Sequence, residues 1–109
     1  MANLFEKGEK LCLSELIDYS ENGVISKRVF ENTSGNITLF SFDKDQKLSE
    51  HSAPFDAFVQ VLEGNASITI GGKPEILLKG DSIIMPANIP HAVYAVEKFK
   101  MLLTMIKEK

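Results

Sequence analysis

Short runs of β-branched, aromatic and aliphatic residues, separated by turn residues about every ten positions, dominate the chain from residue 24 onward. The runs span 24–30, 36–42, 48–53, 57–63, 65–70, 91–96 and 100–106, and the stretch 75–86 contains two more around Gly80-Asp81. No stretch has the period of a long amphipathic helix. Many short strands with turn residues between them are typical of an antiparallel sandwich or barrel, so we predict an all-β fold.

Glycine and proline mark the ends of several predicted strands. Gly71-Gly72 indicates a two-residue hairpin, because glycine accepts a positive φ without steric cost. Residues 1–22 are the least strand-like part of the chain, and within them 14–23 predicts one short helical turn, capped by Ser14 and closed by Gly23. We therefore predict one domain, in which an N-terminal segment (1–22) packs on a barrel formed by 23–109.

Composition excludes several classes of partner. The net charge is -3 and the lysines are scattered without a basic stripe, which argues against binding to nucleic acid. No apolar run approaches the ~20 residues of a membrane span. The first ten residues carry charges where a signal peptide needs an apolar stretch, which argues against secretion. The single cysteine, Cys12, cannot form an internal disulfide, which fits a reducing compartment. We expect a cytoplasmic protein whose partner is a small molecule, a metal or a second copy of the chain.

The middle of the chain resembles the cupin superfamily in its spacing of histidine, glycine and proline. Gly64 matches the closing glycine of the family's first motif, and Gly80 and Pro86, with five residues between them, match its second motif. His51 matches the first histidine of the first motif, and His91 matches the histidine of the second. The resemblance implies an antiparallel double-stranded β-helix, the jelly-roll or cupin barrel.

Three departures from the motifs fall outside the ligand positions. Asp45 stands at the leading glycine of the first motif, and Asn88 stands at the middle glycine of the second. Ala95 stands where the second motif ends in asparagine. The spacing of the two motifs is thus kept better than the residue type at each motif position.

The metal-ligand positions of the two motifs are only partly filled. Ala53 stands where the second histidine would be, and Ala57 where the glutamate would be, so His51 and His91 remain of the usual four ligands. Alternation along a regular strand places Gln60 on the face opposite Ala57. A one-residue bulge would instead turn Gln60 toward the histidines, as an adjunct ligand. The predicted metal ligands are therefore His51 and His91, together with Gln60 if the strand contains the bulge.

Alanine at two ligand positions opens volume and lowers polarity inside the barrel. The side chains predicted to line this pocket, besides the histidines, are Ala53, Ala57, Val59, Val61, Met85 and Val93, with Phe40 as a looser guess. A small apolar pocket with two histidines at its edge suits a modest organic ligand.

The resemblance leaves three functions open. The first is a metal-assisted enzyme, since the family includes dioxygenases, isomerases and decarboxylases. The second is a metal-free barrel that binds or senses a metabolite, and the third is a dimerisation module. We predict a homodimeric cupin barrel that holds a small organic ligand around His51 and His91, with Fe, Mn, Ni or Zn as the divalent cofactor that the resemblance allows. The sequence assigns neither a reaction nor catalytic residues.

Overall fold

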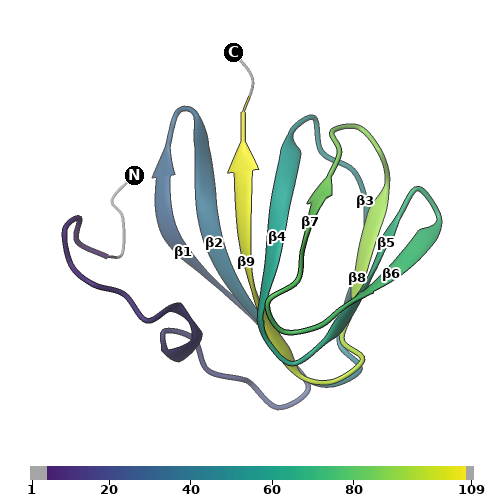
Figure 1. The fold of residues 1–109 in the computed structure, drawn as a ribbon, viewed down its shortest axis with the longest axis horizontal. Coiled ribbons are helices and arrows are strands. Elements are labelled where there is room, and N and C mark those ends of the chain that lie inside the picture. Colours follow the sequence, from purple (N-terminus) through teal and green to yellow (C-terminus); the bar gives the residue numbers. More distant parts are fainter. Residues whose placement is uncertain (1–4, 108–109) are drawn as a thin grey trace.

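Two antiparallel β-sheets face each other in the computed structural model, which describes residues 5–107 (Figure 1). The strands within this range are β1 (Val24–Asn32), β2 (Gly35–Phe42), β3 (Lys47–His51), β4 (Asp56–Glu63), β5 (Ala66–Ile70), β6 (Lys73–Leu77), β7 (Ser82–Met85), β8 (His91–Tyr94) and β9 (Phe99–Ile106). The first sheet has the order β1-β2-β9-β4-β7, and the second has the order β3-β8-β5-β6. This arrangement confirms the predicted all-β jelly-roll barrel.

Backbone conformation explains which turn residues the sequence keeps. Gly71 and Gly72 join β5 to β6 with φ of 57° and 84°, as a two-residue hairpin with positive φ at both positions requires. Asp45 and Asn88, which replace motif glycines, also have positive φ, 71° and 65°. Aspartate and asparagine tolerate this region better than other side chains, so the turns survive the replacement.

Two sequence predictions were wrong in extent. The helical turn is a 3-10 turn, η1 (Leu13–Glu15), so Ser14 lies inside it rather than at its cap. It ends at Glu15, with Leu16 as its C-cap. Gly23 instead closes the next turn by donating its backbone N–H to the Ser20 carbonyl. The strand predicted over 48–53 ends at His51, because the chain then turns through 52–55 to reach the other sheet.

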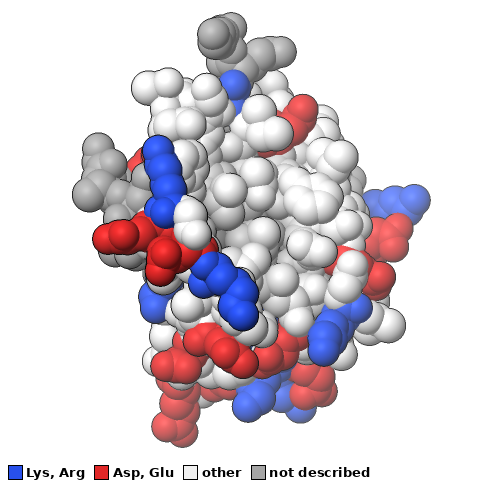
Figure 2. All heavy atoms as spheres, turned by 60° about the vertical axis from the view of Figure 1, so that its left-hand side comes forward, with Lys and Arg blue, Asp and Glu red and all other residues white. Residues whose placement is uncertain are grey.

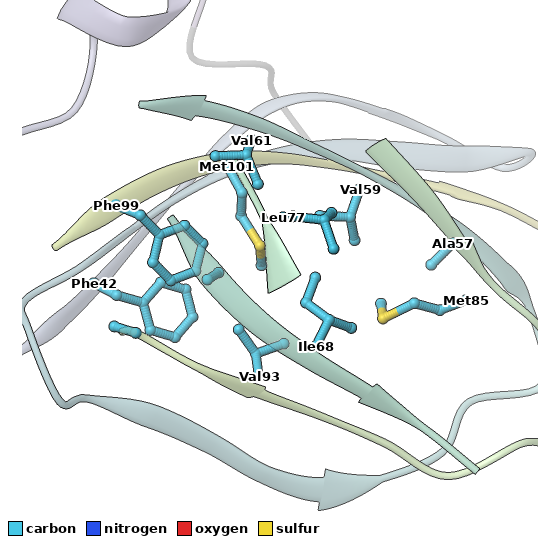
Figure 3. Packing of buried hydrophobic residues seen from close by; sticks show 12 residues of the cluster. Phe42, Ala57, Val59, Val61, Ile68, Leu77, Met85, Val93, Phe99 and Met101 are labelled. Atoms are coloured by element: carbon cyan, nitrogen blue, oxygen red, sulfur yellow. The ribbon is translucent and has the colours of Figure 1, made fainter. Parts of the chain in front are cut away.

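The main core fills the space between the sheets (Figure 3). Alternation along β4 buries Ala57, Val59 and Val61, while Phe58 between them is exposed. Phe42 and Phe99 stack at one end of this core, with ring centroids 4.6 Å apart. Such offset ring contacts add to the free energy gained by burying the aromatic surface.

A second, smaller core lies on the opposite face of the first sheet. Ile17 of the N-terminal segment and Leu39 of β2 are buried in it, and Leu11, Leu13 and Leu16 pack against them. Side-chain hydrogen bonds also hold the same segment, and two of them link it to β9 and β4. Lys100 Nζ donates to the Ser14 carbonyl at 2.6 Å, and Tyr19 OH donates to the Glu63 carboxylate at 2.6 Å. The first sheet is thus covered on both faces along part of its width.

The rest of the surface is mixed in character. On the face shown in Figure 2, basic and acidic side chains alternate around a broad uncharged area. Among residues 5–107, no helix has the length and apolar character that a membrane crossing requires. On neighbouring strands of the first sheet, Phe58, Ile84 and Ile106 are 38%, 63% and 64% exposed. Phe58 and Ile84 are directly paired, so these side chains form one apolar patch.

Candidate functional site

The sheet register brings the chain's two histidines into direct contact. His51 is the last residue of β3, His91 is the first residue of β8, and the two are paired across the strands. Their ring centroids lie 4.4 Å apart with an interplanar angle of 68°, an edge-to-face arrangement. His51 is exposed, whereas His91 is only 6% exposed, so the pair leads from solvent into the interior.

Backbone carbonyl oxygens lie close to Nδ1 of both rings and favour one tautomer of each. His51 Nδ1 lies 2.8 Å from the Ser49 carbonyl oxygen, and His91 Nδ1 lies 3.4 Å from the Ile89 carbonyl oxygen. A carbonyl oxygen can only accept, so these contacts assign the proton of each neutral ring to Nδ1. Each Nε2 then carries a lone pair that is available to a hydrogen-bond donor or a metal ion.

The two imidazoles do not share the same electrostatic environment. Burial lowers the pKa of His91, the nearby His51 lowers it further, and the contact with the Ile89 carbonyl opposes this in part. A lowered pKa keeps His91 neutral at pH 7. The buried member of the pair is therefore an acceptor at Nε2 under neutral conditions.

A cavity of about 110 Å³ lies beside the histidines, between the two sheets. Its lining residues are Leu48, His51, Ala53, Ala57, Met85, His91, Val93, Met101, Leu103 and Met105. The imidazoles are the only titratable groups among them. Larger hollows exist on the outer surface, such as one of about 370 Å³ beside Phe58 and Ile84, but they are more open to solvent. The cavity thus has a polar end formed by two histidines and otherwise apolar walls.

Several residues predicted for the pocket meet in this cavity. Ala53, Ala57, Met85 and Val93 all line it together with the histidines. The alanines at the two missing ligand positions therefore face the same space as the remaining ligands.

Other predicted residues lie elsewhere. Val59 and Val61 are buried in the main core and Phe40 packs against it, but none of the three borders the cavity. The β4–β7 pairing is regular from Ala57 to Gln60, without the bulge that would turn Gln60 inward. The structure therefore does not bring Gln60 to the histidines.

Sequence reasoning missed four lining residues, Leu48, Met101, Leu103 and Met105. Three of them occupy every second position of β9. That spacing places their side chains on one face of a strand, and it could have identified them as residues that point into the barrel.

The donors in the cavity do not fit a complete divalent-metal site. Such sites take three or four protein ligands, with oxygen donors for the harder ions. Here the cavity offers two imidazoles, with Ala53 and Ala57 at the other two motif positions. No group of three or more His, Cys, Asp or Glu within the described part of the chain is placed to hold a metal ion. The predicted Fe, Mn, Ni or Zn ion stays a prediction, with two of its ligands present.

Comparisons with known proteins agree with this architecture. A search of curated proteins found no match. The chain is 38% identical to a conserved protein of unknown function from Streptococcus pyogenes, with a TM-score of 0.91 over 100% of this chain and 97% of that one. It is 31% identical to a cupin superfamily protein from Desulfitobacterium hafniense, with a TM-score of 0.89 over 98% of this chain and 97% of that one.

A third similar structure is longer than this chain. A cupin 2 conserved barrel domain protein from Leptotrichia buccalis is 44% identical, with a TM-score of 0.85. The match covers 87% of this chain but 46% of that one, so this chain spans less than half of that relative's length. A family model described as a cupin domain matches residues 38–107. The chain belongs to the cupin family.

Proposed function

We propose that this cupin is a binding protein whose cavity holds a small organic ligand with a short apolar body and a hydroxyl head. The observation that carries the proposal is the pair of imidazoles at one end of a cavity with otherwise apolar walls. With Nδ1 bonded to the backbone, each Nε2 accepts a hydrogen bond, and a hydroxyl group donates one. We propose binding rather than turnover because, among the described residues that line the cavity, no carboxylate or thiol accompanies the two imidazoles.

The size of the cavity limits the ligand. A cavity of about 150 Å³ accommodates benzene, so one of about 110 Å³ suits a body of roughly four or five carbons. Burying such a body contributes about 0.8 kcal/mol per methylene, and one hydrogen bond contributes about 1 kcal/mol. These terms sum to about 4–5 kcal/mol before the loss of ligand freedom is subtracted, so we expect an affinity no tighter than the millimolar range.

Methionine methyl groups allow this binding to be measured directly. Met85, Met101 and Met105 all line the cavity, so protein labelled with ¹³C at the methionine methyl groups reports on its occupancy. We expect 3-methylbutan-1-ol to shift these signals saturably. Shifts that rise linearly without saturation, or that leave the cavity methionines unmoved, would reject the proposal.

A pair of alanine variants provides the matched control. Ala57→Leu places three additional carbons in the cavity and should abolish the saturable shifts. Ala92→Leu makes the same change between His91 and Val93, at a position that alternation directs away from the cavity, and should leave them unchanged. Equal binding by the two variants would show that the alcohol occupies another site.

The competing metal-assisted function predicts a different measurement. With two imidazoles as ligands, we expect Fe, Mn, Ni and Zn to be substoichiometric in purified protein and to be lost on dialysis against a chelator. Elemental analysis tests this. A stoichiometric ion that resists the chelator in the wild type and is absent from His91→Ala would favour the metal-assisted reading instead.

A further inference from the structure

Methionine is concentrated at the histidine cavity. The chain has four methionines, and apart from Met1 all of them line this one cavity. The same cavity contains both histidines of the chain. Thioether sulfur and imidazole nitrogen are thus gathered in one place, although methionine alone would be an ordinary core residue.

Two of the thioethers flank the missing carboxylate. Ala57 on β4 is paired with Met85 of β7 on one side and with Met105 of β9 on the other. Figure 3 shows Ala57 and Met85 at the same end of the core, with both side chains directed into the space between the sheets. The histidine pair faces this row from the second sheet. Around the alanine that replaces glutamate, the available donors are therefore sulfurs rather than oxygens.

This donor set has a distinct metal preference. Thioethers are soft ligands that select Cu(I), and imidazole also binds copper, whereas carboxylates suit harder divalent ions. All four donors are neutral, so they do not balance the charge of a bound ion. A singly charged ion pays a smaller desolvation cost in such an apolar site than a doubly charged one, because that cost rises with the square of the charge.

We propose that the cavity is a Cu(I) site, in which His51 and His91 supply imidazole nitrogens and Met85 and Met105 supply thioether sulfurs. This site uses the cavity of the proposed function but does not depend on alcohol binding. Copper and the organic ligand would compete, because both use the histidines.

Anaerobic competition with the chromogenic Cu(I) chelator bicinchoninate tests the site. The protein carries Cys12→Ser, because the exposed thiol of Cys12 would bind Cu(I) by itself. We expect one Cu(I) per chain, with shifts of the Met85 and Met105 methyl signals; Cu(I) is diamagnetic, so the signals remain visible. No transfer from the chelator, or transfer without these shifts, would overturn the proposal.

Methionine-to-leucine variants separate ligation from packing. Met85→Leu and Met105→Leu keep the volume of the side chain and should each weaken Cu(I) binding by about tenfold or more. Met101→Leu is the matched control: it lines the same cavity, but it pairs with Val61 and lies beside Phe99, away from Ala57 (Figure 3). Equal affinity in all three variants, or a loss in Met101→Leu alone, would contradict the ligand set.

The alcohol titration, repeated on the same samples, distinguishes the two proposals. If 3-methylbutan-1-ol still shifts the cavity methionines and Cu(I) does not bind, the copper site is refuted and the proposed function stands. If Cu(I) binds with the expected variant pattern and the alcohol does not, the copper site stands and the proposed function is refuted. Far-ultraviolet circular dichroism of each leucine variant shows, independently of either ligand, whether the variant is folded.

Discussion

Replacing Gly64 with alanine should destabilise the protein much more than the same replacement at Gly72. Both glycines have left-handed φ, 76° and 84° respectively. An alanine in this region costs about 1–2 kcal/mol at either position. The surroundings differ: a Cβ at Gly64 would lie 2.0 Å from the Lys98 carbonyl oxygen and 2.8 Å from Phe99 Cα, whereas nothing lies within 4 Å at Gly72.

The contact at Gly64 cannot be relieved by rotating a side chain. Its nearest atoms belong to the backbone at the start of β9, and β9 is paired with both β2 and β4. Forcing an additional carbon into a packed region typically costs about 1–3 kcal/mol. The total is then about 2–5 kcal/mol at Gly64 against about 1–2 kcal/mol at Gly72, a difference near 2 kcal/mol.

Urea unfolding followed by far-ultraviolet circular dichroism measures this difference, since the chain has no Trp to serve as a fluorescent probe. With a slope of about 1–3 kcal/mol per molar urea, a 2 kcal/mol difference separates the two midpoints by about 1 M. The slopes must agree between the variants for this comparison. Midpoints that coincide, with equal slopes, would refute the argument that close backbone approach fixes this glycine.

Three further outcomes are expected. The His91 imidazole should titrate below its ordinary pKa in an NMR pH series, because burial and then His51 lower the pKa, and His51→Ala should raise it; no change in that variant would contradict the coupling. Because the folded protein then binds fewer protons than the unfolded chain, this group's contribution to stability is present above the ordinary pKa and is lost as pH falls through the lowered one. Tyr19→Phe removes a part-buried hydrogen bond to a carboxylate and should cost about 1–3 kcal/mol in urea unfolding, more than Tyr94→Phe, whose equally short bond is exposed; equal costs would count against the role of burial. Finally, we predict a homodimer that associates through the apolar patch around Ile84. Sedimentation should then give a dimer for the wild type and a monomer for Ile84→Asp. A monomeric wild type at micromolar concentration would disprove the association.

The fold was predictable because the turn residues and their spacing can be recognised in short stretches of the sequence. Gly71-Gly72 specifies a two-residue hairpin by itself, and the spacing from Gly80 to Pro86 matches a known motif. The 3-10 turn was less predictable. Its extent is set by contacts that Leu13 and Leu16 make with residues of the first sheet, and those residues are distant in the sequence.

The sequence predicted which strand residues point into the barrel. It did not predict how far along the barrel each of them lies. Alternation correctly directs Val59 and Val61 inward together with Ala57, but it cannot tell which of the three borders the cavity. That depends on how far each strand is shifted against its neighbours. Met105 reaches the cavity because β9 pairs it with Ala57, and neither motif contains this information.

The second core also bears on where this protein can be cut. The family match begins at residue 38, inside β2, and so excludes β1 and the N-terminal segment. A version trimmed to 38–107 would leave Leu39 without Ile17 and would turn β2 into an edge strand with unpaired backbone groups. Such a fragment would contain every residue of the histidine cavity and still be expected to aggregate. For protein production, the unit that folds is larger than the unit that carries the family signature.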